Sequence, residues 1–200
     1  FFHETILAVL ELDLLPPNTK VLVRTDPFRI DAMRRLGVPQ HRILSAGPEP
    51  LLLRQVLIPQ RRLNLKYVGA RLDEMYKRLT ASLRSERGPL RHAGRLVYLD
   101  RRTSPRNTGA NRFVINEQEV TEGLARRGAV TVYLEDYNLV EKSEILSGAD
   151  TIVTAIGANL VNVALSDNIR RIVLIATPLW GHFVHYWKSV LQMRHPHIDV

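Results

Sequence analysis

The chain has 200 residues, 45% of them hydrophobic and 24% charged, a composition typical of a globular domain. It contains no cysteine, which excludes disulfide frameworks, cysteine-ligated zinc and thiol catalysis. The net charge of +8 is concentrated between Arg54 and Arg112, where 15 Lys and Arg accompany only 4 Asp and Glu. A basic segment of this kind indicates a polyanion or a phosphorylated ligand as the partner.

The first half of the chain is expected to hold helices over 2–15, 27–36 and 67–87 and strands over 20–24, 41–45 and 54–58. Pro16-Pro17 ends the first helix, and Gly37 is a natural left-handed cap for the second. Gly88-Pro89 then breaks the chain, which predicts two domains, 1–88 and 89–200. The first residues lack an initiator Met and run directly into a helical pattern, so we expect the amino-terminal lobe to be incomplete.

The second half alternates short apolar strands with amphipathic helices. Strands are expected over 95–99, 130–134, 151–155 and 171–176, and helices over 116–127, 138–146, 158–165 and 183–193. Such alternation predicts right-handed crossovers and a parallel sheet. Ligands bind beyond the carboxyl ends of the strands in these sheets, which directs attention to loops 100–116, 134–138 and 156–159.

The loop that follows the strand 95–99 is rich in arginine. Arg101 and Arg112 stand near its two ends, among hydroxyl and small residues, where guanidinium groups can surround a phosphate. Asn116 opens the next helix, and Glu117 and Glu119 follow in its first turn, where helix capping explains them as well as a ligand does. Most other arginines of the basic segment can equally be solvated surface charges.

Gly157 lies in a turn between a strand and a helix, where backbone can approach a ligand closely. The turn is not the glycine-rich fingerprint of dinucleotide-binding proteins, so a nicotinamide dehydrogenase is disfavoured. Nucleic acid is an alternative polyanion, but aromatics make up only 6% and no nucleic-acid-binding motif is present. The four histidines near the end, 182, 185, 195 and 197, are expected to be surface or packing residues, and no metal site is predicted.

The motifs occur in a familiar order. They run from Tyr98-Leu99-Asp100-Arg101, through Arg112-Phe113-Val114-Ile115-Asn116-Glu117-Gln118-Glu119-Val120, Glu135, Glu144 and Ala149-Asp150, to Gly157-Ala158-Asn159-Leu160-Val161-Asn162. This order resembles glycosyltransferase family 61. The sequence pattern of that family consists of a strand ending in Ser-Arg, an Arg before Asn-Glu-x-Glu-Val, and a later His-Gly-Ala-Gly-Leu-x-Asn turn. Phe2-His3 before a helix also resembles the family's aromatic-His segment.

The resemblance implies a GT-B-like α/β fold of two Rossmann-like lobes with mainly parallel sheets. It implies transfer of a sugar from a nucleotide-sugar donor, with UDP as one candidate carrier, to a glycan or other hydroxyl acceptor. The reaction is expected to proceed with inversion and without a bound metal or other cofactor. The donor is expected to contact eight positions: Arg101, Arg112, Asn116, Glu135, Gly157, Ala158, Asn159 and Leu160. His3, Glu4 and Arg112 are the expected catalytic residues, with His3 or Glu4 as the general base.

Two departures from the family pattern stand out, because Ile156 replaces the family His and Asn159 replaces a Gly. They leave open a catalytically inactive homologue that only binds the donor. A basic nucleic-acid-binding α/β protein is the second alternative. No membrane span is expected, since the best candidate, residues 151–166, is short and interrupted by Asn159. A cytoplasmic or membrane-peripheral enzyme of polysaccharide biosynthesis is expected, with the secretory pathway as the alternative.

Overall fold

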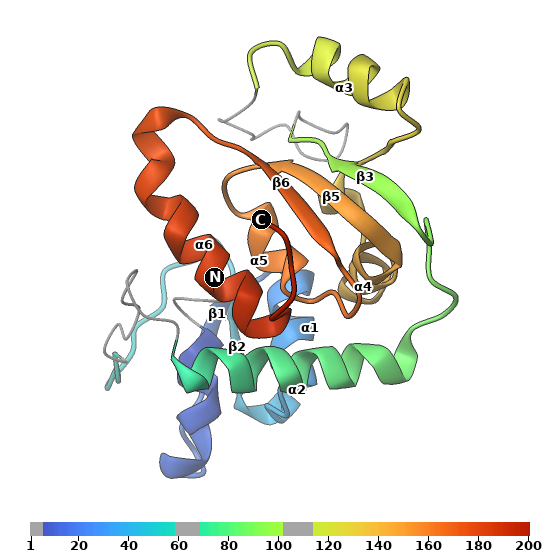
Figure 1. Cartoon of the computed structure of the whole chain (residues 1–200). Coiled ribbons are helices and arrows are strands. Elements are labelled where there is room, and N and C mark those ends of the chain that lie inside the picture. The colour runs from blue at the N-terminus through green and yellow to red at the C-terminus, as the bar shows by residue number, and fades with distance from the viewer. Residues whose placement is uncertain (1–5, 59–68, 102–113) are drawn as a thin grey trace. The chain divides into compact units, whose positions relative to one another are not determined.

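The computed structural model describes residues 6–58, 69–101 and 114–200 (Figure 1). The chain forms two compact units, Phe1–Ser82 and Leu83–Val200. The division falls inside helix α2 (Ala70–Glu86), a few residues before the boundary expected at Gly88.

The first unit contains a small parallel sheet. Its described elements are η1 (Ile6–Leu14), β1 (Val21–Arg24), α1 (Pro27–Arg35), η2 (Gln40–Arg42), β2 (Ile43–Ala46) and most of α2. Strands β1 and β2 pair in parallel, from Val21 opposite Ile43 to Arg24 opposite Ala46. Asp26 caps the start of α1, because its carboxylate accepts a hydrogen bond from the Phe28 N–H at 3.0 Å. Gly37, with φ +89°, adopts the left-handed conformation in the turn that follows α1.

The described part of the first expected helix is a helix of the 3-10 type. One sequence prediction for this unit is wrong. The strand predicted at 54–58 has no regular structure, and the apolar run 51–58 is exposed, with Leu52 entirely so. An apolar run becomes a strand only when a neighbouring strand pairs with it, and none of the described strands does so here.

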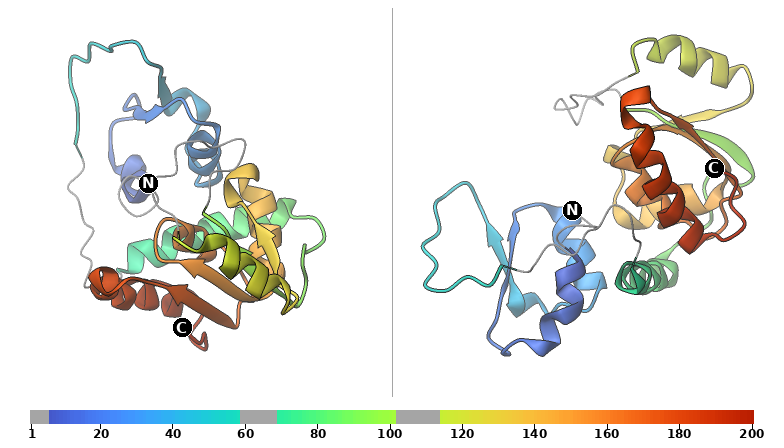
Figure 2. Two further views of the ribbon diagram at one scale, coloured as in Figure 1. Left: turned by 90° about the horizontal axis from the view of Figure 1, so that it is seen from above. Right: turned by 60° about the vertical axis from the view of Figure 1, so that its left-hand side comes forward.

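The second unit is a four-stranded sheet with helices (Figure 2). Its elements are β3 (Arg95–Leu99), α3 (Glu117–Ala125), β4 (Val130–Val132), η3 (Leu134–Asp136), α4 (Leu139–Gly148), β5 (Ala149–Ala155), α5 (Asn159–Val163), β6 (Arg171–Ile175), η4 (Pro178–Trp180) and α6 (Gly181–Arg194). All three strand pairings are parallel, as the sequence predicts. Each of the strands and α-helices lies within a few residues of its expected range, whereas the short 3-10 helices η3 and η4 were not predicted.

The central strands β3 and β5 form the core of this sheet. Tyr98 lies opposite Val153, and Leu99 lies opposite Thr154. These four residues are at most 6% exposed, so both strands are covered on their two faces. Continuous apolar runs such as Leu96 to Leu99 are typical of parallel strands that are buried in this way.

The strand order is β4-β3-β5-β6, so the chain reverses its direction of travel across the sheet once. From β3 the chain proceeds to β4 on one side, and from β5 it proceeds to β6 on the other side. The segments that leave the carboxyl ends of β3 and β5 therefore diverge. This is the topological switch point, the place where open α/β sheets bind their ligands.

Candidate functional site

The carboxyl ends of β3 and β5 bring two segments distant in sequence into contact. Arg101 follows β3, and Ile156 and Gly157 follow β5. The Arg101 Nη1 donates a hydrogen bond of 3.1 Å to the main-chain oxygen of Ile156. A half-buried guanidinium group is thereby held beside the main chain of the turn at the switch point.

Gly157 is required by this arrangement in two ways. Its φ of +149° is a conformation that residues with a Cβ rarely adopt. A Cβ built on Gly157 would also overlap Arg101 Nη1 and lie 3.2 Å from the Cζ. The missing side chain is therefore what allows the guanidinium group to lie against the turn.

The start of α3 is attached to β3 through Glu117. Tyr98 donates its hydroxyl hydrogen bond to Glu117 Oε1, and the Val114 N–H donates to Glu117 Oε2 at 2.9 Å. Glu117 is 4% exposed and Tyr98 is fully buried. The capping alternative therefore explains only part of the role of Glu117, because its carboxylate also bonds to the sheet. Sequence reasoning missed the hydroxyl of Tyr98, since a tyrosine in an apolar strand gives no sign of its partner.

The remaining expected site residues differ in how accessible they are. Asn116, Glu135 and Ala158 are exposed, and Asn116 Nδ2 donates to Glu119 Oε2 at 3.3 Å. Asn159 is buried, and Leu160 is a fully buried core residue that contributes packing. His3, Glu4 and Arg112 lie outside the described residues.

Two buried side-chain amides of α5 add to the polar character of this region. Within the part of the chain that the structure describes, Asn159 Nδ2 and Asn162 Oδ1 have no hydrogen-bond partner. Buried polar groups in proteins are nearly always hydrogen-bonded. Two polar side-chain atoms of α5, the helix that follows the turn after β5, are therefore without a partner among the described residues.

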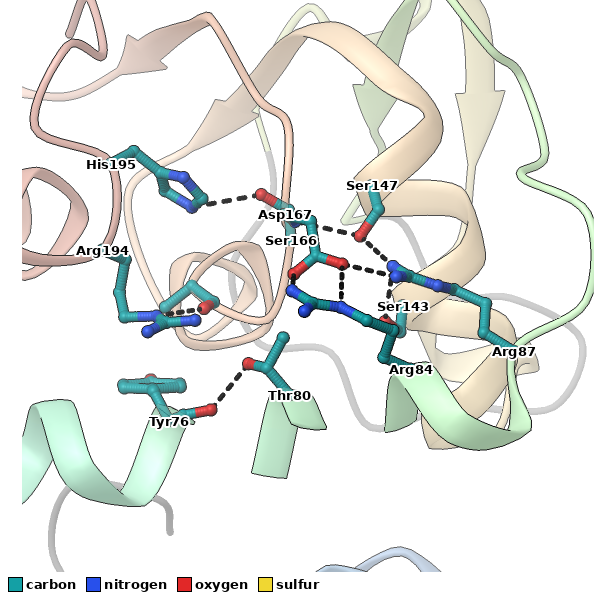
Figure 3. A network of polar contacts seen from close by, with 11 residues as sticks. Tyr76, Thr80, Arg84, Arg87, Ser143, Ser147, Ser166, Asp167, Arg194 and His195 are labelled. Atoms are coloured by element: carbon teal, nitrogen blue, oxygen red, sulfur yellow. Dashed lines mark hydrogen bonds and ion pairs between the residues drawn. The ribbon is translucent and has the colours of Figure 1, made fainter. Parts of the chain in front are cut away.

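The opposite, amino edge of the same sheet carries a separate polar cluster (Figure 3). Asp167, in the turn before β6, accepts from Arg84 Nη2 at 2.9 Å and from Arg87 Nη2. Arg87 Nη1 also donates to Ser147 Oγ at 2.6 Å, and the Asp167 N–H donates to Ser147 Oγ at 3.0 Å. These contacts join the end of α2 to α4 and to the turn before β6, so the cluster stabilises the fold.

The electrostatics of this cluster are dominated by burial and by the two arginines. Burial raises the pKa of the Asp167 carboxyl, but hydrogen bonds and positive charge from Arg84 and Arg87 outweigh it, so the pKa lies below its ordinary value. His195 contacts Ser166, with 3.2 Å between Nε2 and Oγ. Burial, reinforced by the charge of Arg194, lowers the pKa of His195 to about 4.

Glu144, one of the acids in the familiar motif order, has its contacts in the segment that leads into β3 at the amino edge. Its Oε1 accepts the Gly88 N–H at 2.9 Å, and its Oε2 lies 3.0 Å from Arg91 Nε. The main chain of Arg91 passes so close to Gly148 that a Cβ there would overlap the Arg91 oxygen. These residues therefore hold the segment before β3 against α4.

Two surface cavities lie away from the switch point. One, of about 370 Å³, follows β6 between Arg171 and Ala176 and is also lined by Val200. The other, of about 390 Å³, lies at the amino edge and is lined by Gly94 and Gly148 among others. Neither contains Arg101 or the Gly157 turn, which are the groups suited to a phosphate.

Among residues 6–58, 69–101 and 114–200 there is no group of three or more His, Asp or Glu side chains arranged to hold a metal ion. In the same ranges, no helix is long and apolar enough to cross a bilayer.

Fold and geometry together define an α/β protein with a parallel sheet, in which a guanidinium group lies beside a glycine turn at the switch point. The family model described as Glycosyltransferase 61 matches residues 1–173. The chain therefore belongs to glycosyltransferase family 61, which confirms the resemblance read from the motifs, and the family is one of sugar-transferring enzymes. A comparison with curated proteins finds no match.

Proposed function

We propose that the switch point of the second unit binds the diphosphate of a nucleotide-sugar donor, with a uridine nucleotide as the first candidate. The observation that carries the proposal is the contact between Arg101 and the turn after β5, 3.1 Å from Nη1 to the Ile156 oxygen. A guanidinium group beside a glycine turn offers positive charge to a phosphate at a place where a ligand can approach the backbone closely. The unpartnered amide atoms of Asn159 and Asn162 support a ligand in the same region.

The proposed reaction transfers the sugar to a hydroxyl group of a glycan or other acceptor. The acceptor oxygen attacks the anomeric carbon and inverts it, its proton passes to a general base, and the nucleoside diphosphate leaves. Negative charge grows on the leaving group, so Arg101 and Arg112 would act most strongly in the transition state. His3 and Glu4 stay our candidates for the base, and we expect the reaction to need no bound metal.

The two units correspond, in this proposal, to the two lobes of a GT-B arrangement. The unit 83–200 would hold the donor, since it contains the doubly wound sheet. The unit 1–82 would serve the acceptor, since it contributes the candidate base. Polysaccharide biosynthesis is the process we propose for the enzyme.

The test begins with a thermal-shift screen of nucleotides and nucleotide sugars, because a ligand selective for the folded state raises the melting temperature. Transfer from each stabilising donor is then measured with Arg112→Ala and with Arg126→Ala, whose arginine is exposed after α3, as the matched control. A charge-assisted contact contributes about 1.5–3 kcal/mol, so Arg112→Ala should lower turnover by about tenfold to a hundredfold. Equal small effects of both substitutions would refute the assignment of Arg112.

A donor-binding protein without activity is the second candidate, and the side chain at position 156 favours it. Both main-chain groups of Ile156 are hydrogen-bonded: its N–H donates to the main-chain oxygen of Ile175 at 2.9 Å, and its oxygen accepts from Arg101. Its side chain, however, cannot replace the imidazole of the family turn. If the unchanged protein binds nucleotides without turnover, activity gained by Ile156→His would identify the missing group.

A further inference from the structure

The chain leaves β6 at the carboxyl edge of the sheet and enters α6 through η4 (Figure 1). Arg101 and Gly157 follow β3 and β5 at this same edge, because all the strands of the sheet are parallel. The Ile156 N–H donates to the main-chain oxygen of Ile175, the last residue of β6, at 2.9 Å. Neighbouring strands lie about 4.8 Å apart, so the segment 176–183 starts beside the turn that Arg101 contacts.

This segment brings two aromatic rings together. Trp180 ends η4 and Phe183 lies in the first turn of α6, and their ring centroids are 4.9 Å apart with 36° between the planes. The Trp180 N–H donates to the main-chain oxygen of Thr177 at 2.9 Å, which fixes its main chain after β6. Both aromatic side chains are partly exposed, and the neighbouring Leu179 is 85% exposed. An apolar surface with two rings therefore lies in the segment that follows the carboxyl end of β6.

The next turn of α6, by contrast, buries its aromatic residues. Tyr186 and Trp187 have ring centroids 5.3 Å apart and are 5% and 9% exposed. Burial of large aromatic side chains stabilises a fold strongly, so packing alone does not explain a second pair that stays partly exposed. Exposed clusters of apolar side chains mark places where a ligand or another protein binds.

We infer that Trp180 and Phe183 form the subsite for the nucleobase of the donor. The inference rests on the proposed function, because it assumes that Arg101 and the Gly157 turn hold the diphosphate. A nucleoside diphosphate carries its charge at one end and a flat base at the other, so its site needs a cation and an aromatic surface at the same edge. Nucleobases of every kind stack on aromatic side chains, and the indole of Trp180 offers the larger of the two rings.

Inorganic pyrophosphate separates the base from the phosphates, since it presents the diphosphate alone. Trp180→Leu removes the aromatic ring, whereas Trp180→Phe keeps one at the same position. Trp187→Phe is the control for the loss of an indole, because Trp187 is buried in the core. The chain has two tryptophans, so this control also leaves Trp180 as the only source of tryptophan fluorescence.

The dissociation constants of UDP and of pyrophosphate are measured by calorimetry, well below the melting temperature of every variant. We expect Trp180→Leu to bind UDP about tenfold more weakly, the order of a lost base–aromatic stack, and to bind pyrophosphate as the unchanged protein does. Trp180→Phe should keep most of the affinity for UDP. In Trp187→Phe, UDP should quench the fluorescence of Trp180 in a saturable way, and pyrophosphate should not.

Two results would overturn the inference and leave the proposed function standing. One is unchanged affinity of Trp180→Leu for UDP, and the other is equal weakening of UDP and pyrophosphate, which would mean that the substitution disturbs the fold. Failure of the unchanged protein to bind either ligand would overturn both the inference and the proposed function.

Discussion

Replacement of Gly157 by alanine tests whether the arrangement at the switch point binds phosphate. The new Cβ would overlap Arg101 Nη1, so the guanidinium group must move away from the Ile156 oxygen. The φ of +149° adds backbone strain of about 1–3 kcal/mol. We therefore expect Gly157→Ala to unfold at a lower temperature and to lose part of the interaction between Arg101 and the ligand.

The expected loss of affinity follows from the strength of an arginine–phosphate contact. Hydrogen bonds to charged groups contribute about 1.5–3 kcal/mol, and each 1.4 kcal/mol is about tenfold in the dissociation constant. Gly157→Ala displaces Arg101 but does not remove it, so the lost free energy of binding should lie at the lower end of this range. This corresponds to about tenfold weaker binding of UDP. Gly123→Ala is the control, since its Cβ would meet only Arg126 Nη2 at 3.8 Å within a helix; it should stabilise the protein by about 0.5–1 kcal/mol and leave binding unchanged.

A double-mutant cycle tests whether Gly157→Ala weakens UDP binding by displacing Arg101. If Gly157→Ala acts through Arg101, the same change in an Arg101→Ala background should weaken UDP binding little further, because the group it displaces is already absent. The measurement is calorimetric titration of the four proteins at one temperature and one salt concentration. Unchanged affinity in Gly157→Ala, or full additivity of the two changes, would refute the reasoning.

Three further predictions concern the amino edge of the sheet. Asp167→Asn should lower the free energy of unfolding by about 3 kcal/mol in urea titrations, because Arg87 would keep a nearly buried charge without its carboxylate; a loss below 1 kcal/mol would contradict the role given to this cluster. His195, with its pKa lowered to about 4, stays neutral in the fold while the unfolded chain takes up a proton, so stability should fall by up to about 3 kcal/mol as the pH drops from 6.5 towards 4. His195→Asn should remove that part of the pH dependence of the melting temperature, and an unchanged slope would show that another group causes it. Gly148→Ala should yield little folded protein by circular dichroism, since its Cβ would overlap the main-chain oxygen of Arg91, and a native spectrum would mean that this segment can move.

The parallel sheet could be predicted because each strand of the second unit is a short apolar run between amphipathic helices. The same rule located the loops at its carboxyl edge. The strand order could not be predicted, since it depends on which runs pair in space, and the switch point between β3 and β5 follows from that order alone. The contact between Arg101 and Ile156, 55 positions apart, became visible only with the order known.

Charged residues show most clearly what a sequence leaves undetermined. Arg87 lies at the end of a polar helix and reads like the other solvated arginines of the basic segment, yet its side chain is only 10% exposed and bonded to Asp167. Its removal would destabilise the protein, whereas Arg126 is exposed and therefore serves as the surface control. Glu117 reads as a helix-capping acid, but its carboxylate is bonded to a buried tyrosine of β3. Local pattern identifies the helix in both cases, and tertiary contacts decide what the charge does.

We propose that a nucleoside diphosphate binds at the carboxyl edge of the second unit. Titration of isotopically labelled protein with UDP, followed through the main-chain amide signals, tests it most directly. We expect the signals of Gly157 and Ala158 to shift and saturate, while that of Gly94, in the turn before β3 at the amino edge, stays in place. Saturable shifts at Gly94 with none at Gly157 would contradict the proposed site.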